Sequence, residues 1–196
     1  MVDVMGEENF GVGVTLEQYL EQEVHSPYKH EFVDGEVFAM AGGSANHSLI
    51  ATNIITALNI ALDGCPDHIC RVYNSDMRLG VPAAALYTYP DVQVVCGDPE
   101  FGPHETLLNP QLIVEVLSES TKNFDLGGKF EAYRSMRSLK EYLAIYQDRR
   151  RVVRHVALPD ASWQVIEHAE GDFPIRIACG IRLSFDAIYR NVSLNA

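Results

Sequence analysis

The sequence predicts a mixed β-sheet that carries helices, in the α/β or α+β class. Three observations indicate this fold. A long stretch before residue 64 has apolar residues at helical spacing, short runs after residue 69 are apolar or alternating like strands, and helical segments interrupt and follow these runs. With 196 residues, 47% of them hydrophobic, the chain can bury a sizeable core, which excludes a disordered protein.

The N-terminal segment predicts a tail and then a capped helix. Residues 1–13 are rich in glycine and acidic residues, so we expect a flexible tail followed by a single domain over residues 14–196. Thr15 and Gln18 have the spacing of a capping box, which places the start of a short helix directly after Thr15.

A hairpin and the longest helix follow. Asp34-Gly35 separates two strand-like runs within residues 30–40, and this dipeptide is a strong hairpin signal because glycine tolerates positive φ. The next segment begins at a cap, either Ser44 or Asn46, and continues to Gly64. Its apolar residues at helical spacing are Ile50, Ile54, Leu58 and Leu62.

The rest of the chain is dominated by predicted strands. The strand-like runs cover residues 69–79, 90–96, 111–117, 139–146, 149–158 and 162–169. The second and third runs are nearly continuously apolar, as in central strands that are covered on both faces. Residues 121–135 predict a helix between the third and fourth runs, and residues 183–192 predict a short helix at the end.

Composition narrows the functional classes. A net charge of −12 argues against coating nucleic acid with the whole surface, although a local basic groove is compatible with it. No stretch reaches the roughly 18 uninterrupted apolar residues of a membrane helix. The first residues lack the basic and apolar regions of a signal peptide, so we expect a cytoplasmic protein with no membrane segment.

The cysteines and histidines predict no zinc site. The four cysteines form neither a C-x-x-C pair nor a cluster with two well-spaced histidines; they are Cys65, Cys70, Cys96 and Cys179. We expect them to be reduced and mostly buried.

Two carboxylates stand out because of their positions on predicted strands. Glu115 lies inside the apolar run LIVEVL, and Asp91 follows Pro90 at the start of DVQVV. Acidic residues are rarely buried unless they are paired or bind a metal. Neighbouring strands lie about 4.8 Å apart, so the two acids could share one Mg²⁺ or Mn²⁺ ion. The alternative is that Glu115 lies at an exposed strand end and pairs with a neighbour.

A lysine follows on the next predicted helix. Asp125, Lys129 and Tyr133 recur every four residues and therefore share one helix face. Lys129 either forms an exposed ion pair with Asp125, worth about 0.3–0.5 kcal/mol, or is delivered to the metal site. There its positive charge would position a water molecule or neutralise developing phosphate charge.

Taken together, an ordered set of residues resembles the Uma2 family, which is placed in the PD-(D/E)xK nuclease superfamily with its restriction-endonuclease-like fold. The resemblance runs from about Thr15 to the final strands. The residues that carry it are Glu31, Asp34-Gly35, His47, Pro90-Asp91, Glu115 to Ser118, Thr121, Asp125, Lys129, Tyr133 and Glu141-Tyr142.

The resemblance implies a role for each matching position. Asp91 and Glu115 would be the metal ligands, with the Val116 carbonyl as a third oxygen. In many nucleases of this fold the lysine follows the second acid by two residues; that position is Leu117 here, and Lys129 is the match instead. Lys129 would orient or deprotonate the attacking water, and the second role requires a depressed pKa.

Three further positions are candidates for the site. His47 either lines the site or is an ordinary polar residue at a helix N-terminus. Glu31 would add another acid near the metal. Gln93, two residues beyond Asp91 on the same strand, would point to the same face and contact bound water.

The only dense basic segment contains Arg149, Arg150 and Arg151, followed by Arg154 and His155. It could hold a nucleic-acid backbone. The interpretation we favour is a solvated turn and an edge strand protected by charge, because hairpin turns collect charged residues.

The resemblance therefore implies a Mg²⁺- or Mn²⁺-dependent nuclease that hydrolyses phosphodiester bonds of nucleic acid, with DNA as the first expectation. The alternative is an inactive protein of the same fold that acts as a binding or dimerisation module, which the charge of −12 and Leu117 favour. A small-molecule metalloenzyme would need ligands that the sequence does not reveal. By analogy with this fold we expect a homodimer.

Overall fold

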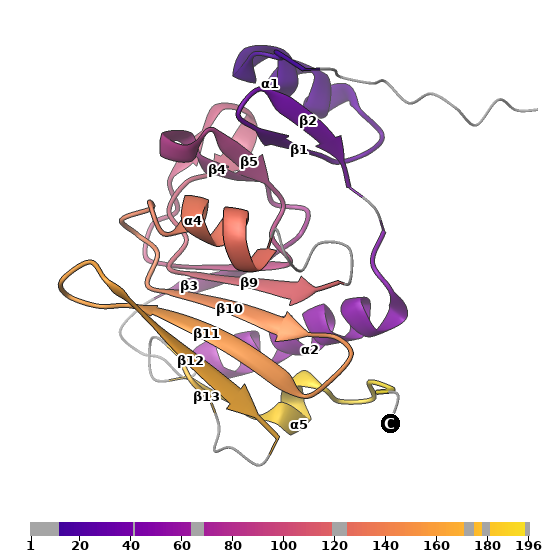
Figure 1. Ribbon diagram of the computed structural model, residues 1–196, viewed down its shortest axis with the longest axis vertical. Helices are drawn as coiled ribbons and strands as arrows, with labels where there is room; N and C mark the ends of the chain where they lie inside the picture. Colours follow the sequence, from indigo (N-terminus) through magenta and orange to yellow (C-terminus); the bar gives the residue numbers. More distant parts are fainter. Residues whose placement is uncertain are drawn as a thin grey trace, which may run out of the picture.

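The computed structural model describes residues 12–40, 42–63, 69–118, 125–170, 175–177 and 181–194. Along the chain, helices separate groups of strands (Figure 1). The helices are α1 (Leu16–His25), α2 (Ala45–Leu62), α4 (Phe130–Tyr133) and α5 (Phe185–Ile188), with short turns η1 (Pro82–Ala84), η2 (Pro103–Glu105) and the π-helical η3 (Asp125–Lys129). The strands are β1 (His30–Val33), β2 (Glu36–Ala39), β3 (Cys70–Asn74), β4 (Leu79–Val81), β5 (Leu86–Thr88), β6 (Val92–Cys96), β7 (Phe101–Gly102), β8 (Thr106–Leu107), β9 (Leu112–Leu117), β10 (Glu141–Tyr146), β11 (Arg151–Ala157), β12 (Trp163–Ala169), β13 (Ile175–Arg176) and β14 (Arg182–Leu183).

Two mixed sheets form the frame. The N-terminal sheet has the order β2-β1-β5-β4-β8-β7, and the main sheet has the order β12-β11-β10-β9-β6-β3. Within the main sheet β9 and β10 are parallel, whereas the other neighbours are antiparallel. Mixed sheets flanked by helices confirm the predicted fold class.

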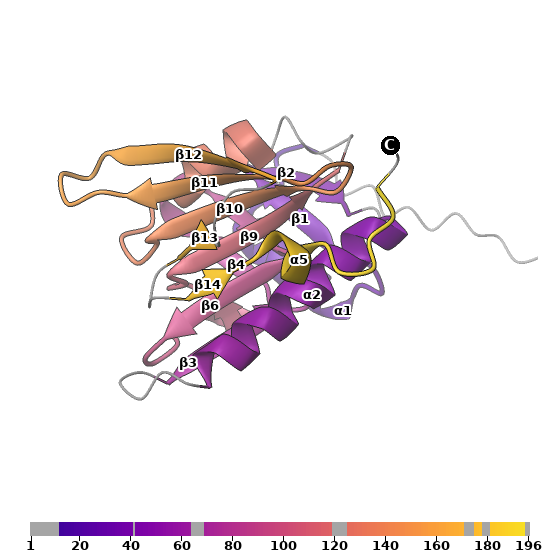
Figure 2. The ribbon, with the colours of Figure 1, turned by 90° about the horizontal axis from the view of Figure 1, so that it is seen from below.

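The main sheet is covered on both faces. Figure 1 shows α4 on one face and α2 on the other, and Figure 2 shows α2 lying across the strands with α5 beside it. Successive side chains of β9 alternate between these layers: Val114 and Val116 pack in the cluster with α2, and Ile113 and Leu117 pack in the cluster with α4. This alternation explains why the sequence of β9 is apolar almost throughout.

The predicted N-terminal elements are confirmed. Thr15 and Gln18 form the capping box of α1. In the β1–β2 turn, Asp34 and Gly35 have φ values of 47° and 88°, as a type I′ turn requires. Ser44 is the residue that caps α2. No helix in the described part of the chain is long and apolar enough to cross a membrane.

Other predicted boundaries differ from the structure. The run 69–79 is not one strand: a turn after Asn74 ends β3, and the chain then crosses to the N-terminal sheet as β4. The short strands β5, β7, β8, β13 and β14 were not predicted, because two or three residues carry no readable period. Of the predicted helix 121–135, residues 125–133 are helical as η3 and α4, and residues 121–124 lie outside the described residues.

The predicted N-terminal tail and the predicted end of the second helix lie only partly within the described residues. Residues 1–11 and Gly64 lie outside the described residues. Val12 forms a bridge with Glu36, and the Gly13 N–H donates to the Gly35 carbonyl at 3.0 Å, so the last residues of the expected tail bind to the hairpin. The domain boundary at residue 14 stays a prediction.

Two cysteines are not reduced. Cys70 and Cys96 face each other across β3 and β6 and form a disulfide, which corrects the expectation of free thiols for this pair. The spacing of 26 residues gives no sign of the pairing, which depends on the β3–β6 register. Cys65 and Cys179 lie outside the described residues.

Candidate active site

The register of the main sheet brings Asp91 and Glu115 together. β6 runs antiparallel to β9 with Val92 opposite Val114, so Asp91, directly before β6, lies beside Glu115. The Asp91 N–H faces Glu115 Oε2 at 3.4 Å, and the Val116 N–H donates to Asp91 Oδ2 at 2.7 Å. The two acids therefore meet across one pair of strands, as the sequence predicted.

Glu115 is buried on the α4 face of the sheet. Its neighbours on that face, Ile113 and Leu117, belong to the apolar cluster that contains Phe130 and Tyr133. Only 6% of the Glu115 side chain is exposed. The alternative of a glutamate at an exposed strand end is therefore wrong.

Lys129 lies where three carboxylates meet. Its Nζ is 2.9 Å from Glu31 Oε1, 3.2 Å from Asp125 Oδ1 and 3.3 Å from Glu115 Oε1. The Lys129 and Asp125 side chains are both buried, so the alternative of an exposed helical ion pair is wrong. A lysine at the end of η3 thus reaches Glu115, whereas Leu117 packs in the apolar cluster.

Two hydroxyl groups hold the carboxylates in place. The Tyr133 hydroxyl donates to Glu115 Oε1 at 2.8 Å, and the Thr88 hydroxyl donates to Glu31 Oε1. Tyr133 comes from α4, and Thr88 is the last residue of β5 beside β1. The site is therefore assembled from both sheets and from the helix between them.

His47 links α2 to the site. It lies in the first turn of α2, which Ser44 caps, and its Nε2 is 3.1 Å from Asp91 Oδ2. The hydrogen bond to Asp91 raises the pKa of His47, although burial opposes this shift. The two interpretations of His47 do not exclude each other, since it is a polar residue at a helix N-terminus and also contacts a carboxylate of the site.

The chain resembles known proteins over most of its length. The family model described as "Uma2: Putative restriction endonuclease" matches residues 16–184. The chain belongs to the Uma2 family. Two uncharacterized Synechocystis proteins, slr1290 and sll1609, are 33% and 36% identical to it over 177 and 156 residues. These alignments cover 90% of this chain and 92% of slr1290, and 79% of this chain and 86% of sll1609.

A solved structure supports the fold of this Uma2 protein. The crystal structure of a "putative nuclease belonging to DUF820" from Anabaena variabilis matches with a TM-score of 0.68. The match covers 87% of this chain and 96% of that one at 15% identity. At this identity the likeness shows the fold, and it agrees with the restriction-endonuclease-like architecture expected from the sequence.

Burial controls the electrostatics of the Uma2 site. Desolvation raises the pKa of Glu115 to about 8, although Lys129 opposes the shift. Burial disfavours the charged form of Lys129, but the carboxylates of Glu115, Glu31 and Asp125 outweigh it and raise the pKa of Lys129. A lysine held in its cationic form is not a general base, so the geometry favours the orienting role over the deprotonating one.

Asp91 and Glu115 each keep an oxygen for a cation. Asp91 Oδ1 accepts no hydrogen bond from the described residues, and Glu115 Oε2 faces only the Asp91 N–H at 3.4 Å. Across the described residues, no group of three or more His, Cys, Asp and Glu side chains is arranged to hold a metal ion. Lys129 Nζ lies between three of the carboxylates instead. The donors therefore fit a hard ion such as Mg²⁺ that takes most of its ligands from water.

Sequence reasoning did not assign every residue of this site. Asp125 and Tyr133 were recognised as sharing a helix face with Lys129, but their contacts were not predicted. Thr88 gave no signal, because its position depends on how β5 packs against β1. Gln93 is buried and donates to the Met77 carbonyl at 2.8 Å, and its contact with water stays a prediction.

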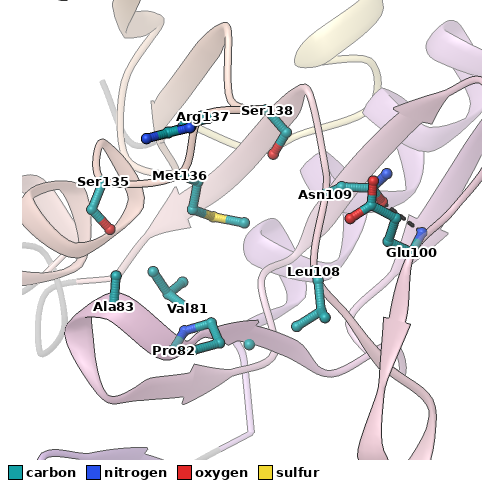
Figure 3. A pocket seen from close by; sticks show the side chains of 11 residues that line it. Val81, Pro82, Ala83, Glu100, Leu108, Asn109, Ser135, Met136, Arg137 and Ser138 are labelled. Carbon is teal, nitrogen blue, oxygen red and sulfur yellow. Dashed lines mark hydrogen bonds between the residues drawn. The ribbon is translucent and has the colours of Figure 1, made fainter.

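A separate pocket of about 300 Å³ lies away from these carboxylates. Figure 3 shows its lining, which includes Val81 of β4, Pro82 of η1, and Met136 and Arg137 of the loop after α4. That loop leads to the first residue of β10, whereas Glu115 lies beyond the middle of the parallel strand β9. None of the carboxylates of the site lines this pocket.

Proposed function

We propose that this Uma2 protein is a Mg²⁺- or Mn²⁺-dependent nuclease that hydrolyses phosphodiester bonds, with DNA as the first substrate to test. The observation that carries this proposal is an excess of negative charge. Among the described residues, three carboxylates share the ammonium group of Lys129, and a fourth contacts His47; they belong to Glu31, Glu115 and Asp125, and to Asp91. Buried charges are normally paired or bound to a metal, so a divalent cation would supply the missing positive charge.

Each residue has a distinct part in this proposal. Asp91 and Glu115 would hold the ion, with the Val116 carbonyl as a further ligand. When bound, such an ion stabilises charge on a phosphoryl group and lowers the pKa of water. Lys129 would orient the attacking water and neutralise charge on the phosphate, and His47 would keep Asp91 in place through its contact at 3.1 Å.

An inactive binding module of the same fold is the second candidate. Leu117 stands at the usual lysine position, and Lys129 is already paired with three carboxylates. We further propose a homodimer, which sedimentation of the purified protein would test, and a cytoplasmic location, which fractionation of cells would test.

The test is cleavage of plasmid DNA and of a long RNA with Mg²⁺, Mn²⁺ or EDTA. We expect the wild type to cut one of them only with metal, and Asp91→Asn to lower the rate by about 10³-fold, because one metal ligand is lost. Asp98→Asn is the matched control, since Asp98 is exposed in the loop after β6. It should keep the wild-type rate.

Two outcomes would contradict the proposal. Cleavage that survives Asp91→Asn would come from another site or a contaminant. A wild type that binds Mn²⁺ but cuts neither nucleic acid would favour the inactive module.

A further inference from the structure

The β10–β11 turn lies at the same end of the main sheet as the carboxylate site. β9 and β10 are parallel, with Ala144 opposite Glu115 and Tyr146 opposite Leu117. β10 ends at Tyr146, so the turn follows at the end of the sheet toward which β9 also runs. Figure 1 shows this turn at the arrowhead of β10.

The arginines of this turn also share a face with the site. Tyr146 is two residues beyond Ala144, so its side chain points to the same face as Glu115. The Arg149 guanidinium lies 4.4 Å from the centre of the Tyr146 ring, and the Arg151 guanidinium lies 5.3 Å from it. Two cations therefore contact one aromatic ring on the face of the sheet that carries Glu115.

The first turn of α2 ties this turn to the site. The Ser44 hydroxyl donates to Gln147 Oε1, and the Asn46 amide lies 3.4 Å from the Gln147 carbonyl. In the same helical turn, His47 contacts Asp91. The distance between the arginines and the carboxylates is thus set by the packing of α2.

The three arginines differ in how their charges are compensated. Arg150 contacts Glu170 and Asp186, which agrees with the expected solvated turn, whereas β11 pairs with both β10 and β12 and is not the expected edge strand. Arg151 pairs with the exposed Glu167. The Arg149 side chain is half exposed, and its acidic neighbour Asp148 is 3.8 Å away. Exposed ion pairs contribute little to stability, and each guanidinium has five N–H donors, so Arg149 and Arg151 keep donors for a phosphate.

From this arrangement we infer that Arg149 and Arg151, supported by the Tyr146 ring, bind a backbone phosphate of nucleic acid next to the cleaved bond. The inference rests on the proposed function, because it names the partner of the same site. A local contact of this kind is compatible with the net charge of −12, which argues against binding of nucleic acid over the whole surface. Arginine is suited to this contact because its planar fork matches two phosphate oxygens.

The experiment compares two double variants that remove the same charge. Fluorescence anisotropy measures binding of a labelled 20-base-pair DNA duplex, and of the RNA duplex of the same sequence, by a Glu115→Gln parent. The test variant adds Arg149→Gln and Arg151→Gln. The control adds Arg134→Gln and Arg137→Gln, which follow α4 on the way to the start of β10. Circular dichroism checks that all variants are folded.

We expect the test variant to bind at least tenfold more weakly than the parent and the control to stay within twofold. The slope of log Kd against log salt should fall by about 1, since the contact with one phosphate is lost. The nucleic acid that the parent binds more tightly identifies the source of the phosphate. Equal affinities of parent and test variant, equal losses in both double variants, or a parent that binds neither duplex would each overturn the inference.

A small substrate separates this failure from failure of the proposed function. Metal-dependent hydrolysis of bis(4-nitrophenyl) phosphate by the wild type requires no contact beyond the carboxylate site. Hydrolysis of the small substrate without a selective loss of duplex binding would support the nuclease function and contradict the phosphate contact of Arg149 and Arg151. Selective loss of binding without hydrolysis would leave a nucleic-acid-binding protein that does not cut.

Discussion

The carboxylate site beneath α4 and the polar network beneath α1 are both buried, but their charges are balanced differently. In the network, Glu23 Oε1 accepts hydrogen bonds from the His30 N–H at 2.9 Å and the Tyr89 hydroxyl at 2.8 Å, and its Oε2 lies 2.9 Å from His30 Nδ1. Arg78 contacts the same hydroxyl at 3.4 Å. The single carboxylate of Glu23 therefore has a partner for each oxygen.

The site under α4 has the opposite balance. Three of its carboxylates share the one ammonium of Lys129, and Asp91 contacts His47. Desolvation accordingly raises the pKa of Glu115 to about 8. From this comparison we infer that a buried carboxylate with a partner for each oxygen belongs to a structural cluster. Buried carboxylates that outnumber their cationic partners indicate a site that binds a ligand.

The largest expected effect comes from removing Lys129. Lys129→Met leaves three neighbouring carboxylates without their cation, so we expect a loss of about 3–5 kcal/mol in the free energy of unfolding at pH 8. Denaturant unfolding measures it. Mn²⁺ should restore part of the loss, because the carboxylates then have another cation.

Lys29→Met is the matched control. Lys29 pairs with Asp76 in a contact where 39% and 76% of the side chains are exposed, so this variant should lose no more than about 1 kcal/mol. Equal losses in the two variants would refute the special position of Lys129.

The same substitution in both clusters should act in opposite directions. Glu23→Gln breaks charge-assisted hydrogen bonds and should cost about 2–3 kcal/mol. Glu115→Gln removes a carboxyl that folding forces toward its neutral form. The unfolded pKa is near 4.5 and the folded pKa is about 8, so the unfolded state binds fewer protons between them, and wild-type stability falls as pH rises. The free energy of unfolding of Glu115→Gln should therefore rise relative to that of the wild type between pH 5 and pH 8. Urea unfolding at both pH values measures this difference, and no relative rise would contradict the account.

Two buried tyrosines provide a finer test. Tyr133 and Tyr142 lie in the same apolar cluster, but only Tyr133 donates to Glu115, whereas Tyr142 donates to the Asp125 carbonyl. Tyr133→Phe removes the hydrogen bond that holds Glu115, a proposed metal ligand, in position. The affinity for Mn²⁺ should therefore fall about 10–100-fold. Tyr142→Phe should change it less than threefold. Similar affinities in the two variants would remove the positioning role of Tyr133.

The smallest expected effect concerns His155, a buried polar residue that belongs to neither the Glu23 network nor the carboxylate site. Neither ring nitrogen of His155 has a hydrogen-bond partner among the described residues, and the ring lies 4.0 Å from that of Phe130. Burial lowers the pKa of His155. The unfolded state therefore binds more protons below about pH 6.5, and stability falls on acidification. Between pH 7.5 and pH 5.5, the free energy of unfolding measured in urea should fall by about 1 kcal/mol less for His155→Phe than for the wild type. Equal losses would contradict the lowered pKa of His155.

The sequence predicted the elements whose pattern is local. Capping residues and helical spacing located α1 and α2, and apolar runs located β6, β9 and β10. The strands of two or three residues were missed, because their pairing is decided by the N-terminal sheet as a whole. The split between β3 and β4 was missed for the same reason: the turn at Asn74 interrupts a run that reads as continuous.

The site was predictable where charge conflicts with its surroundings. An acid within LIVEVL and an acid at the start of the preceding apolar strand were both recognisable, and the Uma2 resemblance indicated Lys129. The hydroxyl of Thr88 and the disulfide between Cys70 and Cys96 depend on strand register. No spacing within the chain encodes such contacts.

The most direct test of the account is titration calorimetry of Mn²⁺ into the wild type, Asp91→Ala and Glu23→Gln. We predict that the wild type and Glu23→Gln bind the ion and that Asp91→Ala does not, because Asp91 Oδ1 accepts no hydrogen bond from the described residues, whereas both oxygens of Glu23 have partners. The Asp91→Ala protein should unfold at nearly the wild-type temperature without metal. Equal binding by the wild type and Asp91→Ala, or no binding by either, would contradict the claim that the unbalanced carboxylates form a metal site.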